Sequence, residues 1–213
     1  MFLRKDVDLK DLFVQTLDWN RVGNQGEYDF SDEKAQLQHR CLLEEVEELR
    51  EALEERDEVE VLDALCDIMF VASYAHFMQM MDTEVEDIQD KGLDHNFVDI
   101  TYTLDDLYTQ LESLCEAKKY YTMIDLILRT SCLFTFDLKK AYANVVESNF
   151  SKFPLVPDTN LEEELEWFEN ESKYSGVIAI STGDRFVFRC NGGAGKIVKP
   201  RCFVEPELEQ YIK

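Results

Sequence analysis

Basic residues, prolines and glycines are scarce in this sequence. Its 213 residues contain 22 Lys and Arg against 45 Asp and Glu, which gives a formal net charge of −23. Nucleic-acid phosphates and anionic lipid headgroups repel so acidic a chain, so we expect neither nucleic acid nor a membrane as a partner. With 4 Pro and 8 Gly, a loop-rich all-β or fibrous architecture is also disfavoured, and long helices are expected.

The six cysteines form no recognisable framework. They are widely spread, with no Cys-x-x-Cys pair and no His at zinc-finger spacing, which disfavours a zinc or disulfide scaffold. The first residues lack the apolar core of a secretory leader, and the longest apolar run, residues 68–81, is too short to span a bilayer. We therefore expect a reduced, soluble, cytoplasmic protein.

The apolar residues follow two different periods. Apolar residues make up 45% of the chain, which is sufficient for a sizeable core. Where they recur every 3.6 residues, they predict helices over about 9–17, 32–55, 58–81, 104–117, 119–133 and 136–150. Residues 177–181 and 185–189 flank Thr182-Gly183-Asp184 and predict a β-hairpin, after a helical connector at 162–166. The predicted fold is a mostly α helical bundle with a small C-terminal β-hairpin appendage.

Half of the residues from 44 to 67 are acidic, and their positions matter more than their number. A charge run is usually a solvated helix face. Here Glu45 and Glu48 border the apolar stripe of the second predicted helix, and Asp63 and Asp67 share one face of the third. Asp67 lies in a segment that is apolar on nearly all sides, where an isolated ionised carboxylate costs several kcal/mol.

If these two helices pack antiparallel, the four acids converge. Clustered carboxylates raise each other's pKa unless a cation neutralises them, and oxygen ligands select hard ions such as Mg²⁺ or Mn²⁺. Salt bridges to other helices are the alternative, but the chain has few basic residues for them. The pattern favours a metal site.

At these residues the sequence resembles the all-α nucleoside triphosphate pyrophosphohydrolases, which include MazG, dimeric dUTPase and phosphoribosyl-ATP pyrophosphohydrolase. Residues 44–48, Glu-Glu-Val-Glu-Glu, match the first half of the superfamily signature, Glu-Glu-x-x-Glu. Residues 60–63 fit the letters of the second half, Glu-x-x-Asp, but residues 67–71 look more like the Asp-plus-apolar run of the family. Whether Glu60 is a ligand therefore stays open.

Two further blocks look like MazG-like proteins often found in phages. Residues 148–152, Ser-Asn-Phe-Ser-Lys, are similar to a Ser-Asn-Met-Ser-Lys segment, and residues 195–200 are similar to a closing Gly-Lys-Val-x-Lys-Pro. Residues 83–133 and 155–194 look like insertions between these blocks. The resemblance implies a helical catalytic domain over 1–153, with 83–133 as a helical insertion, and an extension over 154–213 that closes back on the active site.

The resemblance also implies an activity and roles for individual residues. The activity is Mg²⁺-dependent hydrolysis of a nucleoside triphosphate, NTP or dNTP, between the α and β phosphates. Metal ligation falls to Glu45, Glu48, Asp63 and Asp67, and Glu44 is a candidate catalytic base or outer-shell residue. The substrate-binding candidates are Asn149, Lys152, Lys196 and Lys199. A homo-oligomer, dimer or tetramer, in a bacterial or phage-infected cell is expected.

A non-catalytic role is the competing hypothesis. An acidic helical protein can sequester a basic partner as a DNA-mimic-like inhibitor, or bind a nucleotide without hydrolysing it. The first of these predicts acids spread over an exposed face and no saturable Mg²⁺ or Mn²⁺ binding, so cation binding discriminates between that role and the enzyme.

Overall fold

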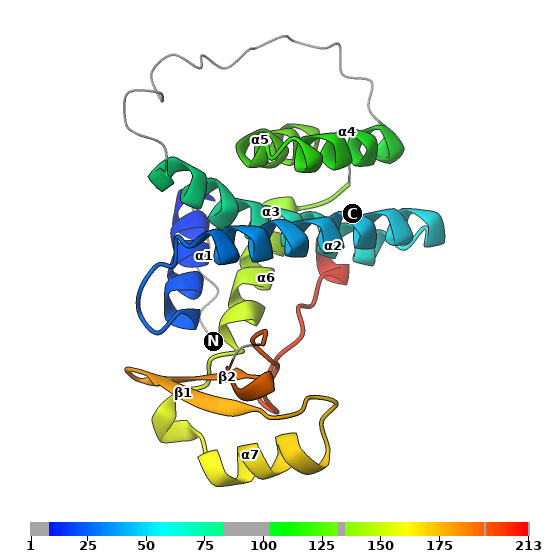
Figure 1. Cartoon of the computed structure of the whole chain (residues 1–213). Coiled ribbons are helices and arrows are strands. Elements are labelled where there is room, and N and C mark those ends of the chain that lie inside the picture. Colours follow the sequence, from blue (N-terminus) through cyan, green and yellow to red (C-terminus); the bar gives the residue numbers. More distant parts are fainter. Residues whose placement is uncertain (1–8, 83–102, 132–134, 194, 213) are drawn as a thin grey trace. The chain divides into compact units, whose positions relative to one another are not determined.

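The computed structural model describes residues 9–82, 103–131, 135–193 and 195–212, and it is mostly helical as predicted (Figure 1). The strands are β1, Ile178–Thr182, and β2, Arg185–Arg189, which pair antiparallel with Ile178 opposite Arg189. The helices are α1 (Leu9–Gly23), α2 (Asp32–Glu55), α3 (Glu58–Asp82), α4 (Leu104–Glu116), α5 (Tyr120–Thr130), α6 (Leu138–Phe150) and α7 (Leu161–Asn170).

The chain forms two compact units. The helical unit contains residues 30–142 and 208–213, and the mixed unit contains residues 1–29 and 143–207. This division differs from the boundary at 153 that the sequence suggests. The reason lies in α1, where the Trp19 ring stacks on Phe153 with centroids 5.0 Å apart and its indole N–H donates to the Asn149 carbonyl at 2.8 Å.

Two pairs of helices build the helical unit. Helices α2 and α3 pack side by side, and α4 and α5 form a second layer on them (Figure 1). The apolar stripe of α2 points into the core as the periodicity predicts, since Leu42, Val46 and Leu49 are buried. The expected helices over 104–117 and 119–133 correspond to α4 and α5, although residues 132–134 lie outside the described part of the chain.

Local hydrogen bonds fix the ends of α2 and α3. At the start of α2, the Ser31 side chain accepts a hydrogen bond from the Lys34 N–H. At the other end, Arg56 caps the helix with its backbone in the left-handed conformation, at φ 59°. Asp57 then caps α3, because its Oδ1 accepts from the Val59 and Glu60 N–H groups at 3.0 and 3.2 Å. A turn of two residues therefore joins the helices, which holds their relative register.

Helix α3 is the central core element. By length and composition alone, residues 58–81 are apolar enough to cross a membrane, but 72% of the most apolar window is buried inside the protein. Leu62, Ile68 and Met69 are fully buried. This burial is typical of the core helix of a globular protein, and it places Asp63 and Asp67 beside apolar neighbours.

The mixed unit has its own core. Helix α7 packs on the β1–β2 hairpin, with Phe168, Phe188 and Val198 buried between them (Figure 1). The connector expected at 162–166 is part of α7. Its Glu164 is 5% exposed and accepts from the Arg201 backbone N–H at 2.7 Å and from Arg201 Nε at 2.9 Å. Glu164 therefore ties the segment after Val198 to α7.

Replacing Glu164 with Ala is expected to lower the free energy of unfolding by about 2 kcal/mol, since it removes two charge-assisted hydrogen bonds and leaves the Arg201 N–H without its acceptor. Chemical denaturation measures the change. Glu166→Ala, an exposed position on the same helix, is the matched control and should stay within about 0.5 kcal/mol of wild type. Equal stability of the two variants would contradict a structural role for Glu164.

Candidate functional site

Four carboxylates gather on adjoining faces of α2 and α3 in the helical unit. Glu45 is half-buried, and the negative charges of Asp67, Glu48 and Asp63 all act on it. Asp63 and Asp67 are half-buried as well, and Glu48 is exposed. The structure thus brings together the four acids that the sequence predicts as metal ligands.

The electrostatics of this cluster are unfavourable without a cation. Burial, followed by the charges of Asp67 and Glu48, raises the pKa of Glu45 to about 9. Burial also raises the pKa of the Cys66 thiol, and the charges of Asp67 and Asp63 add to that effect. When carboxylates are crowded and partly desolvated, one of them keeps its proton at pH values far above those at which a carboxyl group normally ionises.

The donor chemistry of this cluster fits a hard divalent cation. Oxygen-only carboxylate ligands favour Mg²⁺ or Mn²⁺, and a cation would offset the repulsion that keeps Glu45 protonated. Over the described ranges, no three His, Cys, Asp or Glu side chains stand in a ready coordinating arrangement. The assignment of the four ligands therefore stays a prediction.

The remaining acids of this region point elsewhere. Glu44 is exposed, and its charge acts on the thiol of Cys41, one turn earlier on α2. Glu47 is exposed and paired with Arg50 at 2.5 Å, as expected of a surface residue. Glu60 is exposed at the start of α3. Glu44 therefore lies next to the cluster without belonging to its buried part.

A second cluster forms in the mixed unit, where the two motif segments meet. The Ser148 hydroxyl donates to the Val204 carbonyl at 2.7 Å, and the Val204 N–H donates to the Ser151 hydroxyl at 2.9 Å. These bonds hold the chain after Pro200 against the end of α6. Lys152 and Lys199, far apart in sequence, consequently flank one aromatic ring, that of Phe203.

Asn149 makes two side-chain hydrogen bonds within the mixed unit. Its side-chain N–H₂ donates to the Val145 carbonyl at 3.2 Å, and its Oδ1 accepts from Lys152 Nζ at 2.6 Å. Asn149 is 8% exposed. Its Oδ1 therefore orients Lys152, and its role as a donor to substrate stays a prediction.

Lys196 does not join the lysine cluster in the described contacts. Its side chain is exposed, and its backbone carbonyl accepts from the Cys190 N–H at 3.3 Å. Among the four candidate substrate-binding residues, the structure thus groups Asn149, Lys152 and Lys199 and leaves Lys196 on the surface.

Three residues near the lysines were not identified as functional from the sequence. Phe203 contacts both ammonium groups, Glu205 pairs with Lys199 at 2.9 Å, and Trp19 lies 5.9 Å from Lys152 Nζ. Phe203 and Glu205 closely follow the Lys-Pro motif, and this proximity was the available signal. Trp19 was a weak candidate for stacking on a base, and a core role was favoured because an aromatic residue on an amphipathic helix is usually part of the core.

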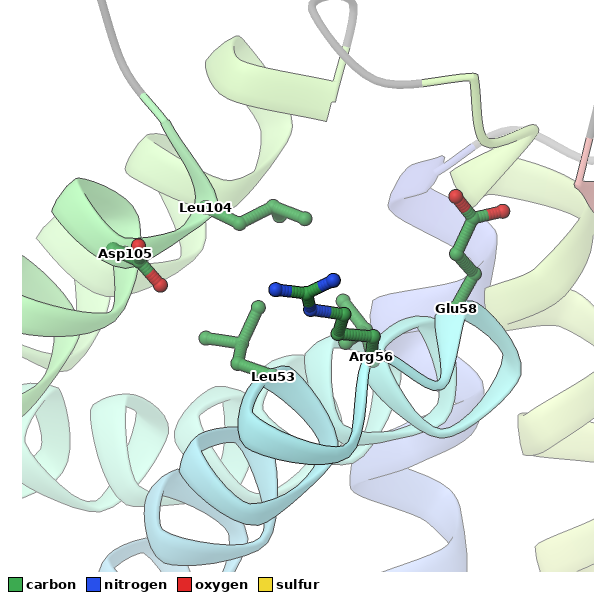
Figure 2. Close-up of a pocket in the computed structure, with 6 residues that line it drawn as sticks. Leu53, Arg56, Glu58, Leu104 and Asp105 are labelled. Atoms are coloured by element: carbon green, nitrogen blue, oxygen red, sulfur yellow. The ribbon is translucent and has the colours of Figure 1, made fainter.

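The helical unit also contains a small cavity at the α2–α3 turn, of about 240 Å³. Figure 2 shows the Arg56 side chain reaching between Leu53 on α2 and Leu104 on α4, with Glu58 and Asp105 at the sides. None of the four clustered acids lines this cavity. Its volume lies below the range usual for ligand pockets.

Comparison with known proteins agrees with the resemblance. The family model described as phosphoribosyl-ATP pyrophosphohydrolase matches residues 13–91, which include α2, α3 and all four clustered acids. Searches of curated proteins and of solved structures gave no match. The family match covers less than half of the chain. It favours nucleotide pyrophosphohydrolase chemistry, and it agrees with the resemblance of residues 13–91 to the all-α nucleoside triphosphate pyrophosphohydrolases, of which phosphoribosyl-ATP pyrophosphohydrolase is one.

Proposed function

We propose that this protein is a Mg²⁺-dependent nucleotide pyrophosphohydrolase that cleaves an NTP or dNTP between the α and β phosphates, giving a monophosphate and pyrophosphate. One observation carries the proposal: Glu45 is partly buried among Glu48, Asp63 and Asp67, and the neighbouring charges that shift its pKa are all negative. This arrangement is costly as a purely structural feature.

The four acids would act as ligands. Glu45 and Glu48 would contribute from α2, and Asp63 and Asp67 from α3. Mg²⁺ bound there would neutralise charge on the phosphate oxygens and acidify an attacking water. The two-residue turn between α2 and α3 keeps the two pairs of carboxylates side by side. All four proposed ligands therefore come from two consecutive helices.

Residues outside the ligand set have supporting roles. Glu44 is exposed beside the cluster, where a carboxylate is able to accept a proton from water. In the mixed unit, Lys152 and Lys199 carry positive charge of the kind that binds phosphate oxygens. Asn149 holds Lys152 through its Oδ1.

The direct test is pyrophosphate release from a panel of NTPs and dNTPs, including phosphoribosyl-ATP, with Mg²⁺ or Mn²⁺. We expect at least one substrate to yield stoichiometric monophosphate and pyrophosphate, and a chelator to abolish turnover. Parallel titration calorimetry with Mn²⁺ should show saturable binding. Saturable Mn²⁺ binding without turnover on any substrate would favour a nucleotide binder, and the absence of both would favour an acidic interaction protein.

A further inference from the structure

We propose that Phe203 is a positioning residue that holds Lys152 and Lys199 as one polyphosphate-binding pair, and that Glu205 is an internal anion that the polyphosphate displaces. The inference rests on the proposed function in one respect: the natural ligand of the pair is taken to be the polyphosphate chain of the nucleotide substrate. The geometry of the mixed unit carries it, without reference to the carboxylate cluster.

The two ammonium groups share one ring. Lys199 Nζ lies 4.3 Å from the centroid of the Phe203 ring, and Lys152 Nζ lies 5.6 Å from the same centroid. Both distances are within the range of a cation–π contact. Free lysine side chains lose considerable rotamer entropy when they bind a ligand, so a ring that already restrains two of them reduces this cost.

The backbone next to Phe203 is held in place by hydrogen bonds. The adjacent Val204 is bonded to both serines of the 148–152 motif, through the Ser148 hydroxyl and the Ser151 hydroxyl. Further along, the Glu207 N–H donates to Asn144 Oδ1 at 2.7 Å. The backbone of this segment is therefore fixed by hydrogen bonds to the side chains of Asn144, Ser148 and Ser151, which positions Phe203 beside the lysines.

A carboxylate already occupies part of this pair. Lys199 Nζ donates to both Glu205 oxygens, at 2.9 and 3.2 Å, while the Glu205 side chain is 69% exposed. An exposed ion pair of this kind is weak and easily exchanged. A ligand with several phosphate oxygens is able to replace that carboxylate on Lys199 and to contact Lys152 at the same time, which a single carboxylate does not do.

The test is titration calorimetry of the full chain with inorganic tripolyphosphate in a chelator, so that metal bound at the carboxylates makes no contribution. Wild type should bind saturably. Phe203→Leu should bind about fivefold or more weakly, because two cation–π contacts are lost, and Phe203→Tyr should bind as wild type does. Glu205→Gln should bind about threefold more tightly, since the competing carboxylate is removed.

Lys173→Ala is the matched control. Lys173 belongs to the same unit, and its Nζ also lies over an aromatic ring, 5.6 Å from the centroid of Tyr174. This variant should bind tripolyphosphate as wild type does. Glu205 is exposed, so its variant tests the proposal even if Phe203→Leu unfolds. Wild-type affinity in both Phe203→Leu and Glu205→Gln, or no binding by wild type, would overturn the inference. Because no turnover is measured, failure of the hydrolase proposal leaves this result intact and distinguishable.

Discussion

Replacing Asp67 with Asn, or Glu48 with Gln, is expected to reduce pyrophosphate release by about a hundredfold or more. Each change keeps the size of the side chain and removes one anionic oxygen ligand from the cluster around Glu45. The loss should appear mainly in kcat, and raising the Mn²⁺ concentration should restore part of it. Initial rates across a metal titration measure both effects.

Glu51→Gln is the matched control for this experiment, because Glu51 lies on α2 but is exposed on the side away from Glu45. It should retain wild-type turnover. If Asp67→Asn and Glu48→Gln both turn over at the wild-type rate, the carboxylate cluster is not the active site. A loss in all three variants would instead indicate a general effect of charge.

Without metal, the wild-type protein should become less stable as the pH rises, and Glu45→Gln should not. The folded-state pKa of Glu45, about 9, exceeds its ordinary value of 4.5, so the folded protein keeps a proton that the unfolded chain releases. Stability contributed by this proton is complete below about pH 4.5 and is lost progressively up to about pH 9, by about 6 kcal/mol at most.

Denaturation in a chelator at about pH 5, 7 and 9 measures this dependence. Mg²⁺ should raise the stability of wild type most at the highest pH, where the carboxylates are ionised. Glu51→Gln again serves as control and should follow the wild-type curve. Parallel curves for wild type and Glu45→Gln would show that Glu45 titrates normally and that the crowding of the cluster is relieved in solution.

The sequence predicts the helical unit well because local patterns determine it. The stripe of Leu42, Val46 and Leu49 determines which side of α2 is buried, and that in turn places Glu45 at the edge of the core. The metal site itself stays a prediction, since periodicity gives the face of a helix and not the rotamers of its carboxylates.

The organisation of the mixed unit was not predictable in the same way. The division of the chain depends on Trp19 reaching Phe153 and on Ser148 bonding to Val204, contacts between segments far apart in sequence. No local propensity encodes such contacts. Resemblance identified the lysines, but their shared ring and the hydrogen bond between Lys152 and Asn149 became visible only in three dimensions.

The two-residue turn between α2 and α3 has a consequence for how the protein folds. Arg56 and Asp57 close a loop of minimal length, and the contacts between the two helices are local in sequence. Such pairing is fast relative to the long-range contacts of the mixed unit. We therefore expect the carboxylates to come together early, before the rest of the chain is in place, and their mutual repulsion to oppose this step. A cation present during synthesis would accelerate folding as well as stabilise its product.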